Sequence, residues 1–290
     1  MLFATERVFD LSGRTACIAT MHGKERVLAP RLQEALGLRC VVPDGLDTDR
    51  FGTFSGERPR TGTALDTARA KALAGIEATG LDLAIASEGS FVPHPEVPAV
   101  QLGIELVLLV DVARGLEIVG RDASLVTNHA RARCRTVEEV ATFGARIGFP
   151  GHGLVLVLGD PPRVVERDVE GAVDLERTAR AILADAERSG LPLFAQSDMR
   201  AHRNPTRMRA IDRSAADLVA RIGTPCPACG RPGFGRVDVV RGLPCTACGT
   251  PTRRPRAARH GCSGCAHVVV VELPEGGAAA EPADCPSCNP

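Results

Sequence analysis

The sequence predicts a mixed α/β domain, with a central sheet flanked by helices, followed by a small cysteine-rich region. Over the first 220 residues, short apolar runs alternate with amphipathic segments of helical period, whereas eight of the eleven cysteines fall between positions 226 and 288. With 290 residues, of which 44% are hydrophobic and 24% charged, the chain can bury a substantial core. We therefore expect an α/β domain over residues 1–222 and a second region over residues 223–290.

The first elements form a strand, a loop, a helix and a second strand. Thr15 to Ala19 is a short apolar run, Glu25 to Leu36 is amphipathic and precedes Gly37, and Leu38 to Pro43 is apolar again. This order predicts a βαβ-like unit. Its first loop, residues 20–24, would lie between a strand's carboxyl end and a helix N-terminus, where anions bind readily.

The next elements place a carboxylate at the end of a strand. Residues 44–59 are polar and predict a loop, Ala64 to Thr79 predicts a helix, and Leu81 to Ala86 predicts a buried strand. That strand would deliver Ser87 to Ser90 at its end. We expect Glu88 to project there from the edge of the sheet, as a metal ligand.

The remaining α/β elements complete the mixed sheet and its helices. Pairs of apolar runs joined by short turns predict hairpins, and the longer amphipathic segments predict helices. The predicted strands are 101–111, 115–120, 154–158, 163–167 and 191–195, and the predicted helices are 137–147, 175–189 and 208–221.

Charge and targeting patterns exclude some classes of protein. Lys plus Arg equals Asp plus Glu, at 35 each, so no overall charge attracts nucleic acid or an anionic membrane. The N-terminus lacks an apolar run of signal-peptide length, and no segment is long and apolar enough to cross a bilayer. We expect a soluble, cytoplasmic protein without a membrane partner.

Eight cysteines form four CxxC motifs, each of which resembles a zinc knuckle. Two intervening residues let both sulfurs face one point, and a tetrahedral zinc ion then needs a second such pair. Fifteen residues separate the first two motifs and nineteen the last two, which fits consecutive zinc ribbons over 226–248 and 262–288. The predicted groups are Cys226, Cys229, Cys245 and Cys248 on one ion, and Cys262, Cys265, Cys285 and Cys288 on the other.

The alternatives are disulfides, redox-active pairs and a different ligand pairing. Disulfides need an oxidising compartment, and a redox CxxC usually stands alone at the start of a helix. Zinc is therefore favoured over these alternatives. Its role would be structural, because a four-cysteine site has no open position for catalysis. Interleaved ligation of the four motifs remains open.

Two basic segments are candidates for binding anions. Residues 251–260 contain Arg253, Arg254, Arg256 and Arg259, and we interpret the segment as a linker that either contacts phosphates or is merely solvated. The second segment, residues 198–207, contains three arginines, a histidine and an aspartate just before a helix. Arg200 is one of these arginines and a candidate ligand of a bound anion.

Several short motifs, taken in order, resemble the inosine triphosphate pyrophosphatase-like superfamily. They are Ile18 to Lys24, Arg60 to Thr63, Thr67 to Ala72, Thr79 to Glu88 and Ala201 to Arg203. His22 or Gly23 stands where that superfamily has asparagine, and Ser87–Glu88 where it has paired aspartates. The complete chain, with its CxxC tail, resembles an uncharacterised bacterial family of unknown function.

The resemblance implies a nucleotide-binding fold with Mg²⁺ and assigns roles to individual residues. Thr20, Lys24 and the adjoining His22 would contact the substrate's phosphates, and Lys71 would support the triphosphate. Glu88 would bind Mg²⁺ or activate water. His202 and Arg203 would close over the nucleotide.

Two functional hypotheses follow. The first is a metal-dependent hydrolase of a nucleoside triphosphate or related phosphorylated metabolite, with Glu88 and Lys24 in catalytic roles and a structural zinc tail. The second is a non-enzymatic protein that binds nucleic acid or a protein partner through its zinc ribbons. Metal-dependent nucleotide turnover would separate the two.

Overall fold

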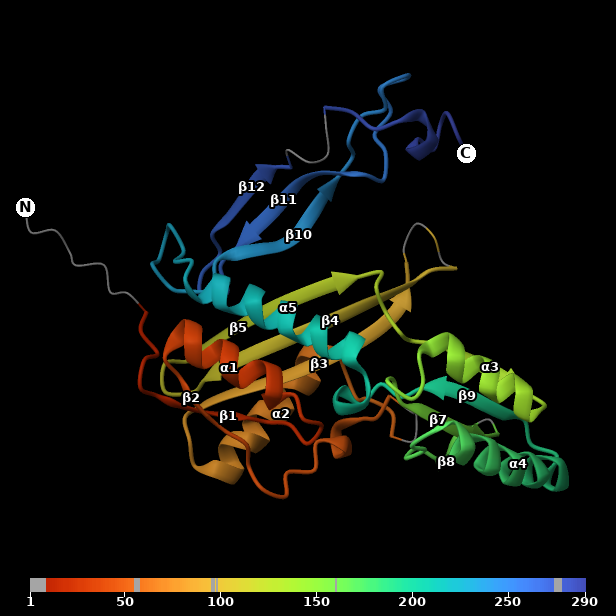
Figure 1. Cartoon of the computed structure of the whole chain (residues 1–290). Helices are drawn as coiled ribbons and strands as arrows, with labels where there is room; N and C mark the ends of the chain where they lie inside the picture. Colours follow the sequence, from red (N-terminus) through yellow and green to blue (C-terminus); the bar gives the residue numbers. More distant parts are fainter. Residues whose placement is uncertain (1–8, 55–57, 95–96, 98, 160, 274–277) are drawn as a thin grey trace, which may run out of the picture. The chain divides into compact units, whose positions relative to one another are not determined.

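The computed structural model describes the whole chain except residues 1–8, 55–57, 95–96, 98, 160 and 274–277. The described chain divides into two compact units, Leu11–Val219 and Ala220–Pro290, the second also including Phe9 and Asp10. The first is the mixed α/β domain that the sequence predicts (Figure 1). Among the described helices, none combines the length and the apolar character that crossing a membrane requires.

A mixed five-stranded sheet, in the order β2-β1-β3-β4-β5, forms half of the first unit. Its strands pair in parallel at β2-β1-β3 and antiparallel at β3-β4-β5. The strands are β1 (Thr15–Ile18), β2 (Arg39–Val41), β3 (Leu83–Pro93), β4 (Gln101–Asp111) and β5 (Leu116–Ser124). The predicted βαβ unit is confirmed, since α1 (Glu25–Leu36) connects the parallel strands β1 and β2.

Helices cover this sheet because its central strands β1, β3 and β4 have consecutive buried residues, which lie on both faces. The helix α2 (Ala64–Thr79) has the predicted bounds and begins after Thr63, whose side chain and that of Asp66 form a capping box. Its small buried residues Ala68 and Ala72 pack on strands β1, β3 and β4. The helix α5 (Pro205–Ile222) packs on β5 so closely that a Cβ added to Gly120 would lie 2.2 Å from the backbone oxygen of Ser214.

A four-stranded sheet, in the order β6-β9-β7-β8, forms the other half of the unit. Its elements are β6 (Arg131–Cys134), β7 (Leu154–Leu158), β8 (Arg163–Glu166) and β9 (Leu193–Ser197), with helices α3 (Val137–Ile147) and α4 (Ala172–Ser189). The helices α3 and α4 supply Phe143, Ile147 and Leu175 to its core. The single mixed sheet of the prediction is thus two sheets. Strand β6 was not predicted, because its alternating arginines carry little apolar signal.

The predicted end of the strand before Glu88 is wrong. Strand β3 continues through Glu88 to Pro93, and Glu88 lies opposite Leu106 of β4. The extension is stable because β4 pairs with β3 along its whole length, whereas β1 pairs only as far as Ile85. Glu88 is therefore not at a strand end. It lies on the stretch of β3 that β1 leaves uncovered.

The second unit contains a three-stranded antiparallel sheet, in the order β10-β11-β12. Its strands are β10 (Gly235–Arg241), β11 (Pro255–Gly261) and β12 (Val268–Glu272). The basic segment 251–260 is therefore not a linker, because most of it is the central strand of this sheet. Short 3-10 helices occur at Asp49–Phe51 (η1), Ala201–Arg203 (η2) and Pro282–Asp284 (η4).

Candidate functional site

A polar cavity lies within the first unit, where loops and strand ends of its two sheets meet. It contains about 630 Å³ of empty space, part of it open to solvent. Residues from the five-stranded half and from the four-stranded half both line it, so segments far apart in the chain meet here. The charged or ionisable lining residues are His22, Lys24, Asp49, Lys71, Glu88, Arg167, Asp198, Arg200 and Arg207.

Lys24 is a buried cation in the wall of this cavity. It lies at the start of α1, and its Nζ donates a hydrogen bond to the Ser87 carbonyl oxygen over 3.0 Å. Burial, followed by the positive charges of Arg207 and Lys71, lowers the pKa of Lys24 to about 7. An anion bound beside this amine would relieve the repulsion and stabilise the ammonium form.

Glu88 is a buried carboxylate held between two cations. Lys71 of α2 donates to its Oε1, and Arg60 donates to its Oε2 over 3.0 Å. Burial opposes ionisation of Glu88, but the charges of Lys71 and Lys24 outweigh burial and hold its pKa below the ordinary value. A divalent cation at Glu88 would have to replace one of these two partners.

A second buried ion pair borders the cavity. Arg207 Nε donates to Glu105 Oε1 over 2.6 Å, and the two side chains are only 3% and 2% exposed. The Arg207 guanidinium also donates to the Met199 carbonyl oxygen and lies 4.1 Å from the centre of the Phe54 ring. These contacts hold Arg207 in place, and the residue lines the cavity.

Five of the eight residues proposed for this site line the cavity, and three do not. His22, Lys24, Lys71, Glu88 and Arg200 lie in its wall. Thr20 is buried, and its Oγ1 accepts the backbone N–H of His22 over 3.2 Å. Within the predicted segment 198–207, Arg200 pairs with Asp198, whereas Arg203 donates to the Val169 carbonyl oxygen. His202 stacks on His22, with ring centres 5.4 Å apart.

Sequence reasoning missed several members of the site. Asp49, Arg60, Glu105, Asp198 and Arg207 all make ion pairs there. Asp198 and Arg207 lay inside a segment already singled out for its charge density. Asp49 and Arg60 lie in a polar loop, and Glu105 lies within an apolar strand. The available signal for Glu105 was an acidic residue inside an apolar run, with no residue of opposite charge next to it.

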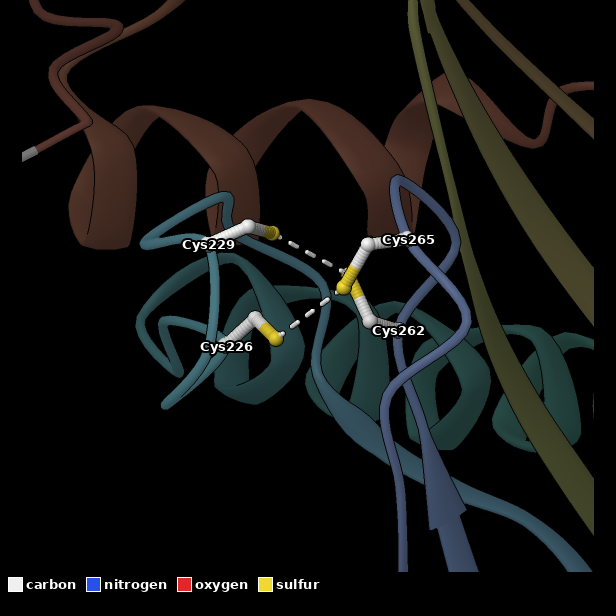
Figure 2. A group of neighbouring side chains, drawn as sticks. All are labelled: Cys226, Cys229, Cys262 and Cys265. Atoms are coloured by element: carbon white, nitrogen blue, oxygen red, sulfur yellow. Dashed lines mark hydrogen bonds between the residues drawn. The ribbon is translucent and has the colours of Figure 1, made fainter.

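The cysteines of the second unit form two clusters, but the predicted pairing is wrong. Figure 2 shows Cys226 and Cys229 turned toward Cys262 and Cys265. The other cluster contains Cys245, Cys248, Cys285 and Cys288, and within each cluster the sulfurs lie within 4.8 Å of one another. The first motif thus joins the third, and the second joins the fourth. The cause is the sheet: its antiparallel strands return the loop after β11 to the start of β10, and the segment after β12 to the β10-β11 connection.

The local geometry of the motifs is that of zinc knuckles. Backbone amides of Ala247, Gly264 and Ser287 donate to the sulfurs of Cys245, Cys262 and Cys285. Gly230 and Gly249, which follow the first two motifs, have φ of 70° and 73°, a left-handed conformation that glycine adopts readily. Four thiols around one point fit a tetrahedral metal ion such as zinc, with no position left for a substrate.

The thiols of one cluster do not ionise independently. The Thr250 hydroxyl and amide lower the pKa of Cys248 to about 6, whereas the neighbouring Cys248 raises the pKa of Cys288 to about 12. Four adjacent thiolates therefore need a compensating cation. A bound metal ion such as zinc would supply this charge and displace the remaining protons.

A family model described as a domain of unknown function, DUF6671, matches residues 71–290. The chain belongs to the DUF6671 family. The matched range includes all eight clustered cysteines together with Lys71, Glu88 and Glu105, and Lys24 and Asp49 precede it. A comparison with curated proteins finds no match.

Proposed function

We propose that the first unit hydrolyses a phosphoanhydride bond in a nucleoside triphosphate or related phosphorylated metabolite, with Mg²⁺ as cofactor. The observation that carries the proposal is the meeting of Lys24, Lys71, Arg200 and Arg207 with the carboxylate Glu88 in one cavity. Cations from both halves of the unit would bind the phosphates and stabilise the charge that develops during cleavage. The ordered motifs that resemble the inosine triphosphate pyrophosphatase-like superfamily agree with this chemistry.

Two features of the cavity favour a ligand with several phosphates. Lys24 carries a positive charge at a cost, because burial and two cations oppose it. The Ser197 hydroxyl, buried in the cavity wall, has no hydrogen-bond partner among the described residues. Phosphate oxygens would satisfy both groups.

Glu88 is the residue that would hold Mg²⁺. It is buried, ionised and surrounded by cations that phosphate oxygens could take over. When Lys71 turns to the ligand, a carboxylate oxygen becomes available as a hard ligand of the kind Mg²⁺ prefers. Bound Mg²⁺ would stabilise charge on the phosphates.

The first test is pyrophosphate release from canonical and deaminated nucleoside triphosphates with Mg²⁺. We expect Glu88→Gln to lower turnover by about 100-fold or more, the scale of losing one preorganised electrostatic group. Ligand binding should persist, because Lys71 and Arg60 lose their competing carboxylate. Glu117→Gln is the matched control, since Glu117 pairs with Arg69 away from the cavity. Absence of turnover by the wild type with Mg²⁺ or Mn²⁺ would refute the proposal.

Binding should also change the protonation of Lys24. With a pKa of about 7, its amine is mostly neutral at about pH 8 in the free protein, and an adjacent anion favours the ammonium form. We therefore expect inorganic triphosphate to bind with uptake of a proton. Calorimetry in buffers of different ionisation enthalpy measures that uptake, and Lys24→Met should abolish it. Equal heats in every buffer for the wild type would contradict this prediction.

The second candidate function is binding of nucleic acid or a protein by the cysteine-rich unit. It is favoured by the exposure of Arg253, Arg254, Arg256 and Arg259, two of which lie on β11. For a nucleic acid, removing one arginine that neutralises a phosphate should reduce the slope of log K against log salt by about 0.9. Replacing all four with Ala should therefore weaken binding to duplex DNA and flatten its salt dependence. Unchanged affinity for DNA and for any protein partner would remove this candidate.

A further inference from the structure

A histidine and an aspartate form a hydrogen-bonded pair in the cavity wall. His22 Nε2 lies 2.9 Å from Asp49 Oδ1, and both residues line the same cavity as Lys71 and Glu88. The two residues come from different segments, the loop after β1 and the 3-10 helix η1. The His22 side chain is 14% exposed and that of Asp49 29%, so the pair is partly shielded but accessible from the cavity.

The pairing assigns different roles to the two ring nitrogens. An ionised carboxylate only accepts hydrogen bonds, so Nε2 carries the proton that Asp49 accepts. The His22 bond holds the pKa of Asp49 below its usual value, against the effect of burial. In neutral His22 the other nitrogen, Nδ1, then has a free electron pair. Among the described residues, Nδ1 makes no hydrogen bond.

The surroundings hold the His22 ring in place. The backbone N–H of His22 donates to Thr20 Oγ1, and His202 stacks against the ring at an interplanar angle of 25°. Burial, followed by the charge of Arg200, lowers the pKa of His202, which favours a neutral His202 ring in the stack. Besides His22, the positive charges of Lys71 and Arg167 act on Asp49. The cavity that the pair lines also contains the charged residues Lys24, Glu88, Asp198, Arg200 and Arg207.

We propose that His22, oriented by Asp49, is the general base that activates water in the hydrolysis proposed above. The inference rests on that function. Water loses a proton to Nδ1 as its oxygen forms a bond to phosphorus, and the bond from that phosphorus to the bridging oxygen breaks. The bridging oxygen leaves with the electron pair as part of pyrophosphate, near the cationic side chains, and the imidazolium then releases its proton to solvent.

Substitution of His22 tests proton transfer separately from binding. In His22→Ala we expect kcat for pyrophosphate release to fall by about 100-fold or more, the usual contribution of a general base. Affinity for a non-hydrolysable α,β-methylene nucleoside triphosphate should change little. Free imidazole in the buffer should restore part of the turnover, which a purely structural role for His22 would not allow.

Two further variants guard against loss of structure. His22→Asn keeps an N–H group for Asp49 but has no basic nitrogen, so it should be as slow as His22→Ala with an unchanged urea midpoint. His152→Ala is the control, because His152 bonds to Thr206 and does not line this cavity. Turnover by His22→Ala within about twofold of the wild type would overturn the inference. Loss of analogue binding without imidazole rescue would also overturn it.

The two proposals fail in different ways. If the wild type releases pyrophosphate and Glu88→Gln does not, the proposed function stands, and the His22 variants decide the inference alone. If the wild type releases none, the proposed function fails and the general base fails with it.

Discussion

Replacing the first and third CxxC motifs together should leave one zinc ion per chain, whereas replacing the first and second should leave none. The first variant changes Cys226, Cys229, Cys262 and Cys265 to Ser, and the second changes Cys226, Cys229, Cys245 and Cys248. In the structure the first set is one complete cluster, and the second set takes two ligands from each. Two remaining thiolates do not form a closed tetrahedral site.

The experiment compares two pairings with equal numbers of substitutions. Zinc released from the unfolded protein, divided by protein concentration, gives the count, and the wild type should give two. If consecutive motifs shared an ion, the two variants would exchange their results. Since structural zinc contributes about 10–16 kcal/mol to folding of small domains, the second variant should also lose the structure of its cysteine-rich unit.

Glu105→Ala should lower the free energy of unfolding of the first unit by about 3–5 kcal/mol, because it leaves the buried Arg207 charge without its partner. The loss arises from an uncompensated charge rather than from the net strength of the pair. The midpoint of urea unfolding measures it. The matched control is Asp122→Ala, which breaks the more exposed pair with Arg213 and should cost at most about 1 kcal/mol.

A double variant separates the charge effect from packing. Glu105→Leu combined with Arg207→Met replaces the pair with apolar side chains and should recover much of the stability. The double variant should nevertheless bind inorganic triphosphate more weakly than the wild type, because Arg207 lines the cavity. A Glu105→Ala variant as stable as the wild type would show that Arg207 finds another partner or solvent.

The interleaved clusters would give each bound metal ion a cross-linking role in the cysteine-rich unit. One cluster joins the start of β10 to the loop between β11 and β12, and the other joins the β10-β11 connection to the segment after β12. Each ion would thus tie together segments that a consecutive pairing would leave separate. Neither residues 226–248 nor residues 262–288 contain a complete cluster, because each cluster takes one CxxC motif from each of these ranges.

Local elements were predictable because neighbouring residues decide them. The bounds of α1, α2 and α3 follow from apolar periodicity and from terminal residues, such as Thr63 at the start of α2 and Gly37 after α1. The four knuckles follow from the CxxC spacing in the same way. These features depend on interactions within a few residues.

The sequence by itself thus determined the helices, most strands, the knuckles and the elements that carry Lys24 and Lys71. Only the tertiary structure decided that β3 extends past Glu88, that the strands form two sheets, and that the CxxC motifs interleave. It also brought Asp49 to His22 and Arg207 to Glu105. The physical reason is that strand pairing and charge pairing join residues distant in the chain, and their register depends on the packing of the whole unit.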